Sequence, residues 1–210
     1  MKQTLRKAVC AVLAGMLLFS LCIVPALATV AKGHAVYRDL NSTNDFFSSL
    51  GHAGLVYARS GNTPTVIIHH PGGFGLNNSY LEKVSFSEFK YPGGNTSLNY
   101  YGSYYVPNTT GYNAIGNLAN TLWSNYHLTY VFNRQLSLKW PVSYVVGQIE
   151  PEDLLSIRCD GLVEYCYEYH GIRLLGTNSA WNISDPAHYT AHTNLLGHTP
   201  ATQRACMTQS

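Results

Sequence analysis

The sequence predicts an α+β domain in which helices pack on one face of a mainly antiparallel sheet. Strand patterns dominate the first half of the chain, helical patterns return in the second half, and the two do not alternate regularly. The 210 residues are 46% apolar and only 11% charged, which excludes disorder as the main state and also excludes a coiled coil. No repeat, charge run or long linker divides the chain after its first 28 residues, so we expect one domain over residues 29–210.

The first 28 residues have the pattern of a secretory signal peptide. Three basic residues within the first seven positions precede an uncharged apolar run over 8–26, and the run ends in Ala26-Leu27-Ala28, a small-x-small cleavage pattern. Cleavage after Ala28 predicts a secreted, extracytoplasmic protein. An uncleaved anchor is the alternative.

Removal of this segment changes the charge of the chain. Three of the 13 basic residues leave with it and none of the 11 acidic residues does, so the remainder carries 10 − 11 = −1. Without a clustered basic face, a nucleic-acid partner is not expected. No later apolar stretch approaches the roughly 20 residues of a membrane span, so no transmembrane anchor is expected after cleavage.

The strand signals come first along the chain. Residues Gly51–Tyr57 (GHAGLVY) and Thr65–His69 (TVIIH) flank the turn sequence SGNTP and predict a β-hairpin. The segment 71–112 is rich in Gly, Asn, Ser and Tyr, with strand-like pieces at Val84–Phe89 and Tyr101–Val106. It reads as sheet edge and loops.

Three helices are expected after this region. The first has apolar residues at the spacing of one buried helix face, namely Ile115, Leu118, Ala119 and Leu122. The second spans about Cys159 to Tyr169, with Gly171 as its C-terminal cap. A third starts at Asp185-Pro186 and stops at Gly197.

Cys159 is the strongest candidate for a nucleophile. It stands at the start of its helix, where free backbone N–H groups and the helix dipole favour a thiolate. A cysteine at a helix start also occurs for purely structural reasons, and that alternative stays open.

Three cysteines remain after the signal segment, and an odd number leaves two interpretations. Cys159, Cys166 and Cys206 are either three buried small hydrophobes, or Cys166 pairs with Cys206 and leaves Cys159 reactive.

A thiol nucleophile needs a base, and His52 is the candidate. Its neighbours Gly51, Ala53 and Gly54 remove bulk around the imidazole. A third polar group would orient the ring, and the next strand carries His69 and His70. Adjacent strand residues face opposite ways, so only one of the two histidines can point toward His52.

Two segments resemble a known family. IRCDGLVEYCYEYHGIRL, from Ile157 to Leu174, resembles the cysteine helix of the NlpC-type papain-like cysteine hydrolases, which read D-C-S-G-L-V-x-Y-x-Y-x-x-x-G-I-x-L. GHAGLVYARSGNTPTVIIHH, from Gly51 to His70, resembles the histidine hairpin of that family, H-V-G-I-Y, a turn and V-I-H. The histidines precede the cysteine here, which is the order of the circularly permuted YiiX-like and lecithin retinol acyltransferase-like branch. SFSEF, from Ser85 to Phe89, also resembles that branch.

The resemblance implies a function and assigns the site. Cys159 would be the nucleophile, His52 the base and His69, rather than His70, the orienting residue. The expected activity is cleavage of an amide bond, most often in a cell-wall peptide, without a metal or organic cofactor. The alternatives are a thiol acyltransferase or lipid amidase on the same scaffold, and a binding protein whose site has decayed.

This sequence departs from the family pattern at two places. Asp160 stands where the family has a small residue, and its charge opposes a neighbouring thiolate. A family tyrosine helps to bind the oxyanion, and Tyr144 in SYVVG matches its motif with a longer spacing, with Tyr130 in TYVF as a rival.

A second histidine pattern suggests zinc but lacks the parts of a protease. His188, His192 and His198 have the spacing of the ligands in H-E-x-x-H-x-x-G-x-x-H, yet Tyr189 replaces the essential Glu and the glycine is displaced to Gly197. Zinc proteolysis is therefore not expected. A structural metal site stays open.

Overall fold

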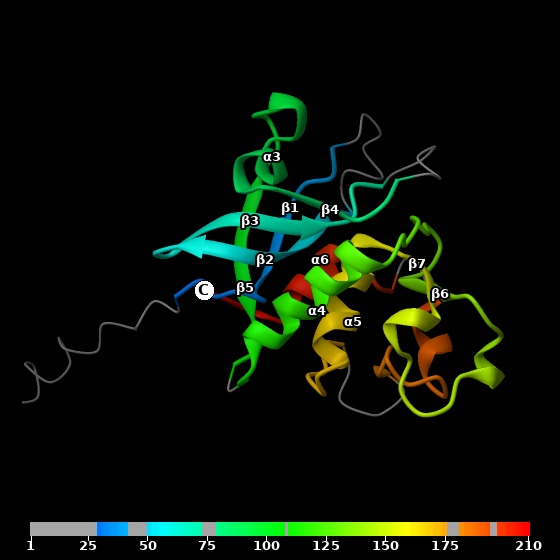
Figure 1. Ribbon diagram of the computed structural model, residues 1–210. Helices are drawn as coiled ribbons and strands as arrows, with labels where there is room; N and C mark the ends of the chain where they lie inside the picture. The colour runs from blue at the N-terminus through cyan, green and yellow to red at the C-terminus, as the bar shows by residue number, and fades with distance from the viewer. Residues whose placement is uncertain (1–28, 42–49, 73–78, 108, 176–180, 194–196) are drawn as a thin grey trace, which may run out of the picture.

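The computed structural model describes residues 29–41, 50–72, 79–107, 109–175, 181–193 and 197–210 (Figure 1). The expected signal segment 1–28 lies outside these residues. No described helix is both long and apolar enough to cross a membrane.

The main element is a six-stranded antiparallel sheet. Its strands, in sequence order, are β1 (Ala35–Arg38), β2 (His52–Ser60), β3 (Thr63–His69), β4 (Glu82–Ser85), β5 (Tyr100–Tyr105) and β8 (Thr208–Gln209). Their spatial order is β4-β3-β2-β1-β5-β8, and every neighbouring pair is antiparallel. The predicted hairpin is β2 and β3, joined at the pair Ser60 and Thr63, with Gly61 in the turn at a φ of 55°. The α+β class is thus confirmed.

The two faces of the sheet bury different sets of side chains. Ala53 and Leu55 of β2 point into the main core with Cys159, Leu162 and the other apolar residues of the late helix. Val56 of β2 points the other way, into a smaller cluster with Ile67 and Phe89. This alternation follows from the two-residue period of a strand.

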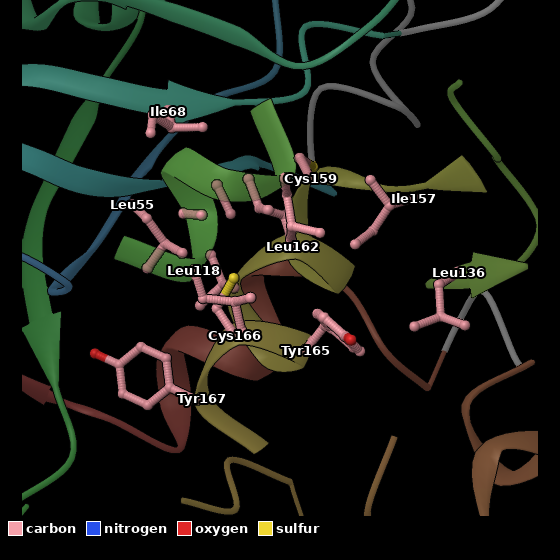
Figure 2. Close-up of a cluster of buried hydrophobic side chains, with 14 of the residues drawn as sticks. Leu55, Ile68, Leu118, Leu136, Ile157, Cys159, Leu162, Tyr165, Cys166 and Tyr167 are labelled. Carbon is pink, nitrogen blue, oxygen red and sulfur yellow. The ribbon is translucent and has the colours of Figure 1, made fainter. Parts of the chain in front are cut away.

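Two helices cover the main core, as expected. Helix α4 (Tyr112–Asn125) buries Ile115, Leu118, Ala119 and Leu122, the predicted face. Helix α5 (Cys159–Glu168) is buried over its whole length, and Gly171 follows it at a φ of 75°. Figure 2 shows Leu162 and Cys166 of α5 next to Leu118 of α4, beneath Leu55 and Ile68 of the sheet.

The prediction that helices pack on only one face is wrong. A short helix, α3 (Phe86–Lys90), inserts Phe89 into the cluster on the opposite face (Figure 1). The expected strand over Val84–Phe89 is therefore only β4 at its start. The backbone N–H of Glu88 donates to the Ser85 hydroxyl at 3.1 Å, which caps the new helix and ends the strand.

The expected helix from Asp185 to Gly197 does not form as an α-helix. Its described part contains turns and a 3₁₀ segment, η5 (Tyr189–Thr193). A regular α-helix, α6 (Pro200–Ala205), follows instead and is capped by Thr199.

The remaining elements are short. A second, two-stranded sheet pairs β6 (Leu136–Leu138) with β7 (Leu154–Ile157) and leads directly into α5. Three further 3₁₀ segments are η1 (Pro92–Gly94), η2 (Val142–Tyr144) and η3 (Pro151–Asp153). Gly161 lets α5 approach β6, because a Cβ there would lie 2.0 Å from the carbonyl oxygen of Gln135.

The disulfide between Cys166 and Cys206, one of the two interpretations left open by the sequence, is not formed between these described residues. Both residues are described and carry free thiols, Cys166 buried in the core and Cys206 exposed after α6. The alternative of three buried hydrophobes also fails, because Cys206 is at the surface.

Candidate active site

The histidine hairpin brings His52 and His69 together. His52 Nε2 lies 2.9 Å from His69 Nδ1, and both rings pack against Phe89. Gly54, directly opposite His69, leaves the room for this arrangement, since a Cβ there would lie 3.0 Å from the Phe89 ring. His52 is fully buried, and its Nδ1 has no hydrogen-bond partner among the described residues. One ring nitrogen of His52 is therefore held by His69 and the other is unused.

His70 points elsewhere and has its own partners. Its Nε2 lies 3.1 Å from the carbonyl oxygen of Leu128, and its Nδ1 accepts the backbone N–H of Gly72 at 3.2 Å. Of the two histidines at the end of β3, His69 is the one beside His52.

Cys159 lies at the first position of α5, on the core side of the sheet. Its side chain is 4% exposed. The main-chain N–H groups of Ala53 and Asp160 interact with the sulfur and act to lower the pKa of the thiol, which favours thiolate. Burial and the Asp160 carboxylate oppose this and are stronger, raising the pKa of the Cys159 thiol to about 12. The helix start favours thiolate, and burial together with Asp160 acts more strongly in the other direction.

The Cys159 thiol and the His52 imidazole lie on opposite faces of β2. The sulfur lies at the amide of Ala53, the residue after His52, but Ala53 faces α5 whereas the His52 ring faces Phe89. Burial first, and then the positive charge of Arg38, lower the pKa of His52 well below its usual value. Both shifts favour the neutral forms of the two groups over a thiolate and imidazolium pair.

Asp160 has a structural partner that accounts for its charge. It is fully buried and forms a two-point ion pair with Arg158, whose Nε and Nη2 donate at 2.5 and 2.8 Å. Gln135 Nε2 donates to the same carboxylate at 3.2 Å, and Arg158 also donates to the carbonyl oxygen of His198. The departure from a small residue after the cysteine thus anchors the start of α5 to the surrounding loops.

The structure places Tyr144, the expected oxyanion-binding residue, away from Cys159. Tyr144 ends η2 with 76% of its surface exposed, and it does not line the pocket that Cys159 lines. Its rival Tyr130 does line that pocket, and Gly72 allows the Tyr130 ring to approach within 2.3 Å of where a Cβ would be. The prediction for Tyr144 depended only on the distance of the SYVVG motif from Cys159 along the chain. In the structure the motif lies in a surface segment, so its tyrosine is exposed.

The pocket at Cys159 is small and mainly apolar. Besides Arg158, Cys159 and Thr199, it is lined by Leu40, Leu50, Gly51, Tyr130, Phe132 and Pro200. These walls come from loops at one end of the main sheet and from the start of α6.

Arg38 is a site residue that sequence reasoning missed. It pairs with His52 across β1 and β2, is 4% exposed, and its guanidinium lies 5.3 Å from the centre of the Phe89 ring. Burial lowers the pKa of Arg38 to about 10, and the electrostatic interaction with Cys159 acts to raise that pKa. The sequence shows a charged residue at the end of an apolar four-residue strand. Only the pairing of β1 with β2 shows that this residue lies beside His52.

The His188, His192 and His198 pattern does not form one cluster. His188 Nδ1 lies 3.0 Å from Asp185 at the surface, whereas His192 and His198 are buried with ring centres 5.2 Å apart. Across the described ranges, the groups that could share an ion include His192 but neither of the other two.

Comparison with known proteins adds no relative. No family model, no curated protein and no solved structure matches the chain. The NlpC-type resemblance therefore stays a proposal carried by the motifs themselves, beside the α+β class that the structure establishes.

Proposed function

We propose that the protein is a cysteine hydrolase of papain-like type that cleaves an amide bond. The observation that carries this proposal is the buried His52 and His69 pair, in which His69 holds Nε2 and leaves Nδ1 unpaired, one residue from the amide that contacts the Cys159 sulfur. A buried, unsatisfied imidazole nitrogen is costly unless it serves a purpose. In this proposal the purpose is to accept the proton of the Cys159 thiol, which requires the His52 ring to turn from Phe89 toward the core face of β2.

The directions of the two pKa shifts suggest the order of events. His52 Nδ1 takes the proton of Cys159 as the sulfur attacks the substrate carbonyl, because both shifts favour a thiol and a neutral imidazole before substrate binds. The resulting imidazolium gives that proton to the leaving amine, the C–N bond breaks, and a thioester remains on Cys159. Water, deprotonated by His52, then releases the acid and restores the thiol.

Two features would stabilise the charges that develop. The backbone N–H of Cys159 at the start of α5 would bind the oxyanion, since an α-helix leaves its first N–H groups without internal partners. Arg38 supplies a buried positive charge near both Cys159 and His52. That charge favours thiolate and disfavours a long-lived imidazolium, which again fits a transient proton transfer.

The substrate class is proposed from the resemblance and from the pocket. The motifs and the N-terminal signal pattern favour a secreted enzyme acting on a cell-wall peptide. The second candidate is a thiol acyltransferase or lipid amidase, and the apolar walls of the pocket, including Leu40, Leu50 and Phe132, favour it.

The experiment compares digestion of muropeptides and of an N-acyl amide lipid, each analysed by mass spectrometry. The test variants are Cys159→Ala and His52→Ala, and the matched control is Cys166→Ala, which removes a thiol on the same helix. We expect loss of cleavage in both test variants and retention in the control. Cleavage of the lipid alone would select the second candidate. No cleavage of either substrate, with no trapped thioester on Cys159, would identify a binding protein.

A further inference from the structure

A second cluster of buried polar groups lies further along α5, apart from Cys159. Glu164 and Glu168 are one turn apart on the helix, and η5 brings His192 against them. The three side chains are 0%, 3% and 2% exposed. One ligand atom from each lies within 4.8 Å of the other two.

Each of the three side chains has one polar atom in use and one without a partner. Glu164 Oε2 accepts from Gln135 Nε2 and, at 3.3 Å, from Gln203 Nε2, while Glu168 Oε2 accepts the backbone N–H of Ile183. The other oxygen of each carboxylate is buried and makes no hydrogen bond within the geometric limits in the described structure, and the same holds for Nε2 of His192. The backbone groups of Leu174 and Trp181 also act on Glu168 and His192, but three buried polar atoms without a close partner in one place are unusual in a protein core.

The charge of the cluster is only partly compensated. Burial raises the pKa of Glu168 to about 8, and it is stronger than the charge of Arg173, which acts to lower that pKa. Two carboxylates removed from water in this way cost several kcal/mol each unless a counter-charge is present. Arg158, the nearby buried cation, is already engaged by Asp160.

The geometry is close to that of a metal site. Gln135 Oε1 lies 2.6 Å from His192 Nδ1 and accepts its proton, which orients the ring as neighbours of metal ligands do. Nε2, the ring nitrogen without a hydrogen-bond partner among the described residues, is therefore the nitrogen that an ion would take. Glu168 also lines a surface groove with Asn182 and Ser184, which provides a route for an ion.

We propose that Glu164, Glu168 and His192 bind a divalent transition-metal ion such as Zn²⁺ or Mn²⁺. Two carboxylates with one imidazole suit these ions better than Mg²⁺, which prefers oxygen ligands alone. The ion ties η5 to α5 and has a structural role, since the ligands follow Cys159 by five or more residues and do not line its pocket. The site is independent of the proposed hydrolase activity.

The test measures metal binding by the full chain after removal of metals with a chelator. Calorimetric titration with ZnCl₂, MnCl₂ and MgCl₂ is run on the wild type and on Glu164→Gln, Glu168→Gln and His192→Gln. The matched controls are Glu152→Gln, an exposed acid on η3, and His188→Gln from the same histidine pattern. Circular dichroism and thermal melting follow each variant.

The expected result is one Zn²⁺ or Mn²⁺ per wild-type chain, with a higher melting temperature in its presence. Each ligand variant should bind at least about tenfold more weakly, and both controls should bind as the wild type does. Absence of binding by the wild type at about 1 mM ion would overturn the proposal, as would unchanged binding in the folded ligand variants. Higher stability of metal-free Glu168→Gln together with no wild-type binding would show instead a carboxyl pair that shares a proton.

Discussion

Acidification should destabilise this protein through His70, a buried histidine whose hydrogen bonds select its neutral form. Its Nδ1 accepts the Gly72 N–H while its Nε2 faces the Leu128 carbonyl, so the neutral ring satisfies both partners. Protonation of Nδ1 would place two donors face to face. Burial lowers the pKa of His70 from 6.5 to about 4.

The sign and size of the effect follow from proton linkage. As pH falls through 6.5, the unfolded chain gains a proton at this position and the folded chain does not, so stability is present above pH 6.5 and is lost as pH falls toward 4. Between about pH 7.5 and pH 5.5 the loss from one such histidine is about 1.3 kcal/mol. His34 and His69, with pKa values lowered to about 4 and about 3 mainly by burial, add losses of the same sign.

The assay is urea unfolding at the two pH values, followed by circular dichroism. His70→Gln should reduce the pH-dependent loss of unfolding free energy by about 1 kcal/mol. His127→Gln, an exposed histidine, should leave that loss unchanged. An NMR titration of His70 gives an independent reading in the wild type, and a pKa above about 6 would refute the reasoning even if the variant fails to fold.

Three further predictions concern the start of α5 and the free thiols. Gly161→Ala should destabilise the fold by about 2–3 kcal/mol in urea unfolding, because the new Cβ would overlap a backbone carbonyl at 2.0 Å; an unchanged midpoint would contradict the close approach. Asp160→Asn should cost about 3–5 kcal/mol by leaving Arg158 buried without its partner. In samples that stay folded it should also speed alkylation of Cys159, since the Asp160 charge raises the pKa of that thiol; an equal or slower rate would count against this. Cys206→Ser should abolish the fastest thiol reaction of the native protein and change stability by less than about 0.5 kcal/mol, whereas a large loss of stability would indicate that this thiol is bonded.

The local patterns in the sequence predicted the elements that depend on near neighbours. The hairpin over β2 and β3 and the helices α4 and α5 follow from side-chain periodicity and from the turn residues between them. The short helix α3 had its own signal, Ser85 followed three residues later by Glu88, which is a capping pattern that the strand interpretation overlooked.

Contacts between distant segments decided the rest. Strand β1 has only four residues, too few for a periodic pattern that would predict its place between β2 and β5. The pairing of β1 with β2 puts Arg38 beside His52. The same limit applies to Tyr144, whose motif says nothing about the loops that expose it.

The sequence by itself determined that Cys159 begins a buried helix and that His52 and His69 share a hairpin, because these depend on periodicity and turn chemistry within a few residues. Only the tertiary structure decided the protonation of the thiol and the gathering of Glu164, Glu168 and His192. Both depend on which groups lose contact with water, and that is a property of the packed core as a whole.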